Sequence, residues 1–162
     1  MTPIVETHCH LDYLDPESLR ATLDAAADYG IERIVTIAVS PDNLETVRNL
    51  AAQNQQVWCT QGIHPHEASA WNQDVAEKVI AGCDEARTVA VGEIGLDYHY
   101  DHSNRTAQAR ALDEQLHIAA QQNLPVVIHT RDADDDTRAI LSNHSRNLTK
   151  KGVIHSFTSS LA

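Results

Sequence analysis

Residues 3–12 read PIVETHCHLD, a short apolar run that leads into two histidines two positions apart. Side chains alternate between the two faces of a strand, so His8 and His10 point the same way and Cys9 points to the other face. Two neutral imidazoles side by side are suitable ligands for a divalent transition metal such as zinc. An isolated His-x-His pair is more often surface-exposed or locally hydrogen-bonded, so the pattern acquires weight only from the rest of the chain.

Composition predicts one globular domain over residues 1–162. Of the 162 residues, 42% are hydrophobic and 22% are charged, which is ordinary for a soluble protein with a proper core. The sequence has neither an apolar run long enough for a membrane span nor a signal peptide, so we expect a cytoplasmic protein without membrane association. The cysteines, Cys9, Cys59 and Cys83, are widely spaced and are expected to be buried thiols.

The net charge of -11 disfavours binding of nucleic acid through a general basic surface. It does not exclude an enzyme of nucleic acids, because bound divalent ions can supply the positive charge that a phosphodiester needs. The chain has ten histidines, and this enrichment is a reason to look for metal ligands.

Apolar strands alternate with amphipathic helices along the chain. After the first strand, strands are expected at residues 31–39, 57–63, 88–91, 124–129 and 152–155. Helices are expected to begin after Asp15 and Ser40, each followed by a proline, and over residues 73–83, 105–122 and 132–143. This alternation predicts an α/β fold with a parallel sheet covered by helices.

Candidate ligands recur at one phase of this repeat, at or just past the predicted carboxyl end of a strand. In a (β/α)₈ barrel these ends converge on one mouth. Taken singly, the histidines could be buried and bonded to backbone carbonyls or lie in a turn, and the glutamate could be solvated. The shared phase favours a common site made of His8, His10, His64, Glu93, His129 and His155.

Several motifs of the chain resemble those of the TatD family of metal-dependent deoxyribonucleases, a branch of the amidohydrolase-like barrels. The resemblance covers almost the whole chain in register and rests on residues 7–12 (THCHLD), 62–66 (GIHPH), 91–98 (VGEIGLDY), 125–131 (PVVIHTR) and 154–157 (IHSF), with Gln108 and Gln115 on the helix between. It implies a TIM-barrel-type (β/α) fold of which about six of the eight βα units are present, an incomplete barrel.

The resemblance also implies roles for individual residues. Two divalent cations, Mg²⁺, Mn²⁺ or Zn²⁺, would be held by His8, His10, Glu93, His129 and His155. Glu93 would bridge the ions as the catalytic carboxylate, and the reaction would be hydrolysis of phosphodiester bonds in DNA. His64 and Arg131 resemble substrate-side positions that meet a phosphate. Asp12 and Asp97 would orient ligands through hydrogen bonds to their second nitrogen.

The C-terminus departs from the family pattern, because the last metal-binding aspartate would follow a later strand. We therefore expect a chain that lacks the last two βα units and associates with itself through open barrel edges. Two alternatives stay open: a C–N or ester hydrolase of the wider amidohydrolase group, and a metal-binding but inactive fragment. The first usually has a carbamylated lysine where this chain has Glu93.

Overall fold

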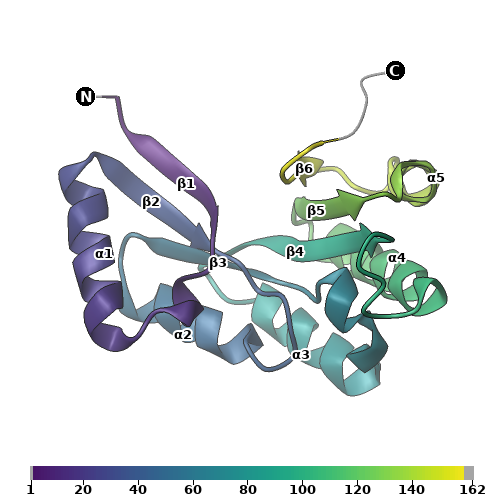
Figure 1. Cartoon of the computed structure of the whole chain (residues 1–162), viewed down its shortest axis with the longest axis horizontal. Helices are drawn as coiled ribbons and strands as arrows, with labels where there is room; N and C mark the ends of the chain where they lie inside the picture. The colour runs from purple at the N-terminus through teal and green to yellow at the C-terminus, as the bar shows by residue number, and fades with distance from the viewer. Residues whose placement is uncertain (1, 159–162) are drawn as a thin grey trace.

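The computed structural model describes residues 2–158 and shows one curled parallel sheet. Its strands lie in chain order, β1-β2-β3-β4-β5-β6, and every neighbouring pair is parallel. They are β1 (Ile4–Cys9), β2 (Ile31–Thr36), β3 (Val57–Gln61), β4 (Thr88–Asp97), β5 (Val126–Arg131) and β6 (Gly152–Ile154). Figure 1 shows β1 and β6 at opposite ends of the curl, with helices along its outside. The predicted barrel-type (β/α) repeat is confirmed, with six parallel strands and five α-helices among the described residues; Met1 and residues 159–162 of the predicted domain lie outside them.

The helices that follow the strands are α1 (Pro16–Asp28), α2 (Leu44–Gln53), α3 (Gln73–Cys83), α4 (Arg105–Gln121) and α5 (Asp134–His144), with 3₁₀ turns at η1 (Leu11–Tyr13) and η2 (Pro65–Ala70). The start of α1 is as predicted, because the Asp15 carboxylate accepts hydrogen bonds from the amides of Glu17 and Ser18. The predicted start of α2 is wrong. Asn43 Oδ1 accepts from the amides of Val39 and Ser40, which folds this segment into a turn before the helix begins.

Strand β4 is the largest departure from prediction, because it continues six residues past the expected end at Val91 and finishes at Asp97. Two glycines, Gly92 and Gly95, make this possible, because a side chain at either position would collide with β5. A Cβ on Gly95, whose φ is +154°, would lie 1.8 Å from the carbonyl oxygen of His129 on β5. The register also shifts between Val91 and Ile94, so the motif is a strand with an irregularity, not a loop. Glu93 therefore lies within a strand.

The sheet is well buried at its centre and open at its two ends. Val57 on β3 and Val91 on β4 are fully buried against helices, whereas Ile4 of β1 is 51% exposed and Val153 of β6 is 56% exposed. Cys59 and Cys83 are buried, Cys9 is partly buried, and all three thiols are free. Among residues 2–158, no helix has the length and apolarity needed to cross a membrane.

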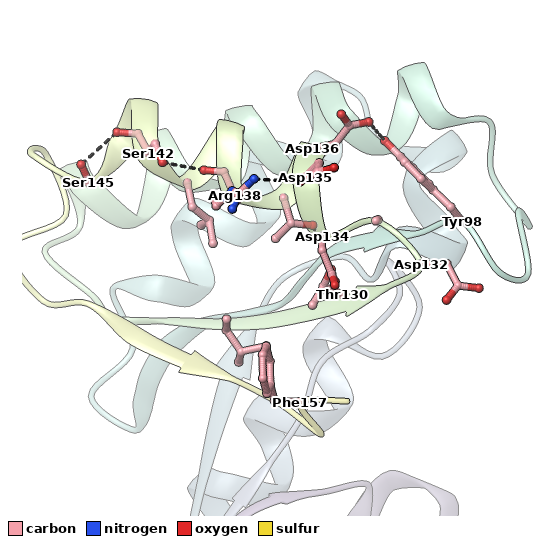
Figure 2. Close-up of a pocket in the computed structure, with 14 residues that line it drawn as sticks. Tyr98, Thr130, Asp132, Asp134, Asp135, Asp136, Arg138, Ser142, Ser145 and Phe157 are labelled. Atoms are coloured by element: carbon pink, nitrogen blue, oxygen red, sulfur yellow. Dashed lines mark hydrogen bonds and ion pairs between the residues drawn. The ribbon is translucent and has the colours of Figure 1, made fainter. Parts of the chain in front are cut away.

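A hollow of about 820 Å³ lies beside α5 at the β6 end of the sheet. Figure 2 shows Phe157 below it and the acidic first turn of α5 above, where Asp136 accepts a hydrogen bond from Tyr98. The hollow contains none of the histidines discussed below. It marks the open edge of the sheet and is not the chemical centre of the molecule.

Candidate metal centre

Glu93 lies at the centre of a group of imidazoles contributed by different strands. The carboxylate is 4% exposed. Its Oε2 is 3.3 Å from Nε2 of His8 on β1, and its Oε1 is 3.3 Å from Nδ1 of His129 on β5. The imidazole of His155, just after β6, stacks on that of His8 with ring centroids 3.4 Å apart. The carboxylate thus has one oxygen directed to each side of the group.

The contacts of Glu93 keep it anionic. Burial alone would raise the pKa of this carboxyl, but hydrogen bonds from His129 and His8 outweigh the loss of water and hold the pKa well below its usual range. Burial likewise lowers the pKa of His129, yet its contacts with Glu93 and Asp97 more than compensate and raise it above the ordinary value. The centre is therefore an anion surrounded by nitrogen donors.

Asp97, at the end of β4, fixes His66 and His129 by hydrogen bonds. Its Oδ2 is 2.9 Å from Nε2 of both His129 and His66, and its Oδ1 accepts from the amides of His99 and Tyr100. Burial raises the pKa of Asp97, but these hydrogen bonds lower it to about 2. A carboxylate that fixes one ring nitrogen of a histidine orients the other nitrogen toward a metal.

Two sets of possible ligand atoms meet at Glu93. His8, Glu93 and His155 form one set, and His64, Glu93 and His129 form the other; within each set the donor atoms lie within 4.8 Å of one another. Burial lowers the pKa of His64 to about 3, so the imidazole is neutral, and its Nδ1 accepts a hydrogen bond from the amide of His66 at 3.2 Å. The residue expected on the substrate side thus lies among possible ligands.

Buried donor atoms without partners are a further sign that this group fits a metal. Nδ1 of His8 and Nδ1 of His10 are buried and have no hydrogen-bond partner, although such atoms are normally satisfied in folded proteins. His10 lies edge-on to His8 with ring centroids 5.4 Å apart and stacks on Tyr13; it belongs to neither set of three. Nitrogen and carboxylate donors together suit Zn²⁺ or Mn²⁺.

The remaining predicted residues lie around this group. Asp12 Oδ2 accepts a hydrogen bond from Asn43, and its Oδ1 is buried without a partner. Arg131 ends β5, and its guanidinium lies over the ring of Tyr100, 4.9 Å from the centroid. An exposed arginine in this position is free to meet an anionic group of a substrate.

Sequence reasoning missed His66 as a contributor. Its Nε2 bonds to Asp97, and its ring lies edge-on to those of His64, 4.4 Å away, and His102, 4.5 Å away. The signal was present in the His64-Pro65-His66 spacing, since proline holds the backbone extended before the 3₁₀ turn. The spacing did not predict how this loop lies relative to the end of β4, and that position brings His66 to Asp97.

The fold and the site together define a class of protein. Histidines and carboxylates gather at the carboxyl side of the strands of a parallel α/β half-barrel, which is the donor set and the position found in barrel-type metal-dependent hydrolases. Comparison with known sequences makes the class specific. The model of the TatD related DNase family matches residues 5–162, and the chain belongs to this family.

Individual relatives agree with that assignment. The chain is 35% identical over 161 residues to YjjV of Escherichia coli (strain K12), named as an uncharacterized metal-dependent hydrolase, a match over 97% of this chain and 61% of the relative. It is 36% identical over 129 residues to a 3'-5' ssDNA/RNA exonuclease TatD of Cronobacter sakazakii (strain ATCC BAA-894), covering 80% of this chain and 49% of the relative. The chain thus spans about half to three fifths of these curated proteins.

A solved structure shares the fold. The crystal structure of YjjV, a TatD homolog from Escherichia coli K12, superposes with a TM-score of 0.88 at 34% identity, over 97% of this chain and 61% of that one. The predicted membership of the TatD family and its barrel-type fold are therefore confirmed.

Proposed function

We propose that this chain carries a centre for two divalent metal ions that hydrolyses phosphodiester bonds of DNA. The observation that supports the proposal best is that two sets of possible ligands share Glu93. A carboxylate has two oxygens, so one residue can contact both ions, as two-metal hydrolases require. The related exonuclease is named for single-stranded DNA and RNA, which favours single-stranded nucleic acid as the substrate.

The residues have distinct parts in this proposal. His8 and His155 would hold one ion and His129 the other, and Glu93 would offer an oxygen to each. His64, whose Nδ1 accepts a hydrogen bond from the amide of His66, is proposed on the substrate side, as its place in the family motif implies. His10, which lies beside His8 and has a buried Nδ1 without a hydrogen-bond partner, would add a ligand on the His8 side once its ring turns toward the ion. When bound, the two ions supply a water nucleophile near neutral pH and neutralise the charge that develops on the phosphate oxygens.

The other residues orient these groups and the substrate. Asp97 holds Nε2 of His129, which keeps Nδ1 of the same ring directed at Glu93. Asp12 remains a candidate for the same task at the β1 end. Arg131 is positioned to bind a phosphate of the substrate by paired N–H donors, a geometry that lysine lacks.

The rival reaction, hydrolysis of C–N or ester bonds, has less support. It usually employs a carbamylated lysine at the fourth-strand position, where this chain has Glu93. Lys78 lies on α3, and Lys151 donates to the carbonyls of Ser145 and Leu148.

A cleavage assay tests the proposal. The 162-residue chain, and a version extended by two βα units from a longer relative, are incubated with Mg²⁺ or Mn²⁺ and 3'-labelled single-stranded DNA, with a p-nitrophenyl ester as the rival substrate. Metal-dependent loss of 3' nucleotides in the presence of the 162-residue chain supports the proposal. Ester cleavage without DNA cleavage overturns it, and activity of the extended protein alone identifies the shorter chain as an inactive metal-binding form.

A further inference from the structure

Aromatic side chains gather beside the metal centre, on the loop that follows β4. Tyr100 is 51% exposed, and His102 is also exposed. Their rings are nearly parallel, at 16°, with centroids 5.8 Å apart. The ring of His66, on η2, lies edge-on to both, with its centroid 5.6 Å from that of Tyr100 and 4.5 Å from that of His102. Neither Tyr100 nor His102 belongs to the two sets of possible ligands around Glu93.

The position of Tyr100 is fixed by the same carboxylate that holds a proposed metal ligand. Oδ1 of Asp97 accepts a hydrogen bond from the amide of Tyr100 at 2.9 Å. Oδ2 of Asp97 is 2.9 Å from Nε2 of His129. Asp97 is fully buried, so the aromatic loop and the metal centre share one rigid anchor.

Arg131 connects this aromatic surface with the phosphate site proposed above. Its guanidinium lies 4.9 Å from the centroid of the Tyr100 ring. Its carbonyl accepts a hydrogen bond from the amide of Tyr98, which keeps the loop after β4 beside the end of β5. A phosphate bound by Arg131 would therefore lie next to Tyr100, with the base of the same nucleotide in reach of the ring.

A hollow of about 670 Å³ opens beside these rings, between η2 and the loop after β4. Its two walls are joined by Ser103, whose hydroxyl accepts a hydrogen bond from the amide of Ser69 and donates one to the carbonyl of His66. The imidazoles of His66 and His102, which both contact Tyr100, form part of its lining. The space next to the stacked rings is thus a formed part of the surface.

We infer that Tyr100, supported by the parallel ring of His102, stacks on a base of single-stranded nucleic acid while Arg131 binds the phosphate of the same nucleotide. The inference rests on the proposed function, which supplies nucleic acid as the substrate, and goes beyond it by naming the residues that contact a base. Aromatic rings and guanidinium planes bind unpaired bases of any sequence, because every base has a π-face. With a net charge of -11, the chain lacks a general basic attraction for the strand, so stacking supplies affinity that charge does not.

Binding of labelled strands tests the inference without relying on cleavage. The full 162-residue chain is titrated into a fluorescein-labelled strand of ten thymidines and into a matched strand of ten abasic residues, and fluorescence anisotropy gives both dissociation constants. The titrations are made in CaCl₂, and a denaturing gel verifies that the strands stay intact. Tyr100→Ala removes the ring, and Tyr100→Phe keeps it. Tyr29→Ala is the matched control, because Tyr29 is 77% exposed at the end of α1, near the amino ends of β1 and β2.

We expect Tyr100→Ala to bind the thymidine strand roughly 5- to 150-fold more weakly than the parent, which corresponds to about 1–3 kcal/mol for one stacked base. Its affinity for the abasic strand should stay at the parent's value. Tyr100→Phe and Tyr29→Ala should bind both strands as the parent does, and circular dichroism verifies that each variant is folded.

Three outcomes would overturn the inference: a parent that binds the two strands equally, an unchanged affinity of Tyr100→Ala for the thymidine strand, and an equal loss on both strands. The cleavage assay described above reports on the proposed reaction separately. A chain that shows the expected base-dependent binding but no cleavage counts against the proposed hydrolysis and supports the stacking surface. Cleavage with an unchanged Tyr100→Ala affinity supports the hydrolysis and overturns the stacking surface.

Discussion

Replacing Glu93 by glutamine should remove most of the stabilisation that metal gives this chain. The substitution keeps the shape of the side chain and removes the charge that lies between His8 and His129, at 3.3 Å from each ring. For metal affinity the interaction that is lost is the one between the carboxylate charge and each ion. Taken at about 1.5 kcal/mol per ion, the lower end for a contact to a charged group, the loss for the two ions is about 3 kcal/mol. That corresponds to a loss of about 100-fold in metal affinity.

The expected size of the signal follows from binding linkage. A metal concentration 100 times the dissociation constant stabilises the parent by about 2.7 kcal/mol, and a 100-fold weaker variant gains about 0.4 kcal/mol. The difference of about 2.3 kcal/mol equals roughly 5–9 °C in melting temperature for a chain of this size.

Differential scanning fluorimetry with and without ZnCl₂ measures this difference, with Cys9→Ser as the control. Cys9 lies on the strand face opposite His8 and His10, and its thiol donates to the carbonyl of Val35 at 3.6 Å, a contact that serine can keep. The control should show the parent's zinc shift. An undiminished zinc shift in the Glu93→Gln protein would refute the role of Glu93, and an equal loss in Cys9→Ser would refute the strand-face argument.

Three further predictions concern the edges, the close strand contact and the pH dependence. Because Val5 is 50% and Val153 56% exposed on the two open edges, the chain should self-associate in sedimentation velocity; a monodisperse monomer with a sharp, high melting transition would contradict this. Gly95→Ala should destabilise the chain by about 3 kcal/mol or more in urea, because the added Cβ meets the carbonyl oxygen of His129; a loss below ~1 kcal/mol would show that β5 can move away. Binding of zinc requires neutral His129, whose pKa lies above its usual 6.5. The zinc affinity measured by calorimetry should therefore rise by up to about tenfold per pH unit until the pH passes that pKa. An affinity that stays constant between pH 6 and 8 would exclude release of a proton from His129 on binding.

The sequence predicted the elements whose cause is local. Period-two alternation accounts for His8 and His10 on one face, and the Asp15-Pro16 pair accounts for the start of α1. The parallel arrangement then requires that side chains near the ends of successive strands gather on one side of the sheet, which is why Glu93, His129 and His155 come together although they are far apart in sequence.

Features that depend on contact between elements were not predictable in this way. The predicted fourth strand ended at Val91, before the glycines at 92 and 95, because the close approach of β5 that makes them strand residues is a tertiary property. The bond between His66 and Asp97 depends on how the loop after β3 lies over the end of β4. Likewise, Asp113 bonds to His144 only because α4 and α5 pack side by side, and the sequence of neither helix alone predicts this contact.

The observed length of β4 changes how the proposed centre should behave. Glu93 belongs to a central strand held on both sides by β3 and β5, so its carboxylate has a fixed position. His8 and His155 instead come from the two edges of the sheet, and these strands are not hydrogen-bonded neighbours, yet their imidazoles stack at 3.4 Å. An ion held by His8, Glu93 and His155 would therefore tie both edges to the rigid centre. On this view metal binding and association through open edges are opposed, because the ion stabilises the curled sheet that association would have to distort.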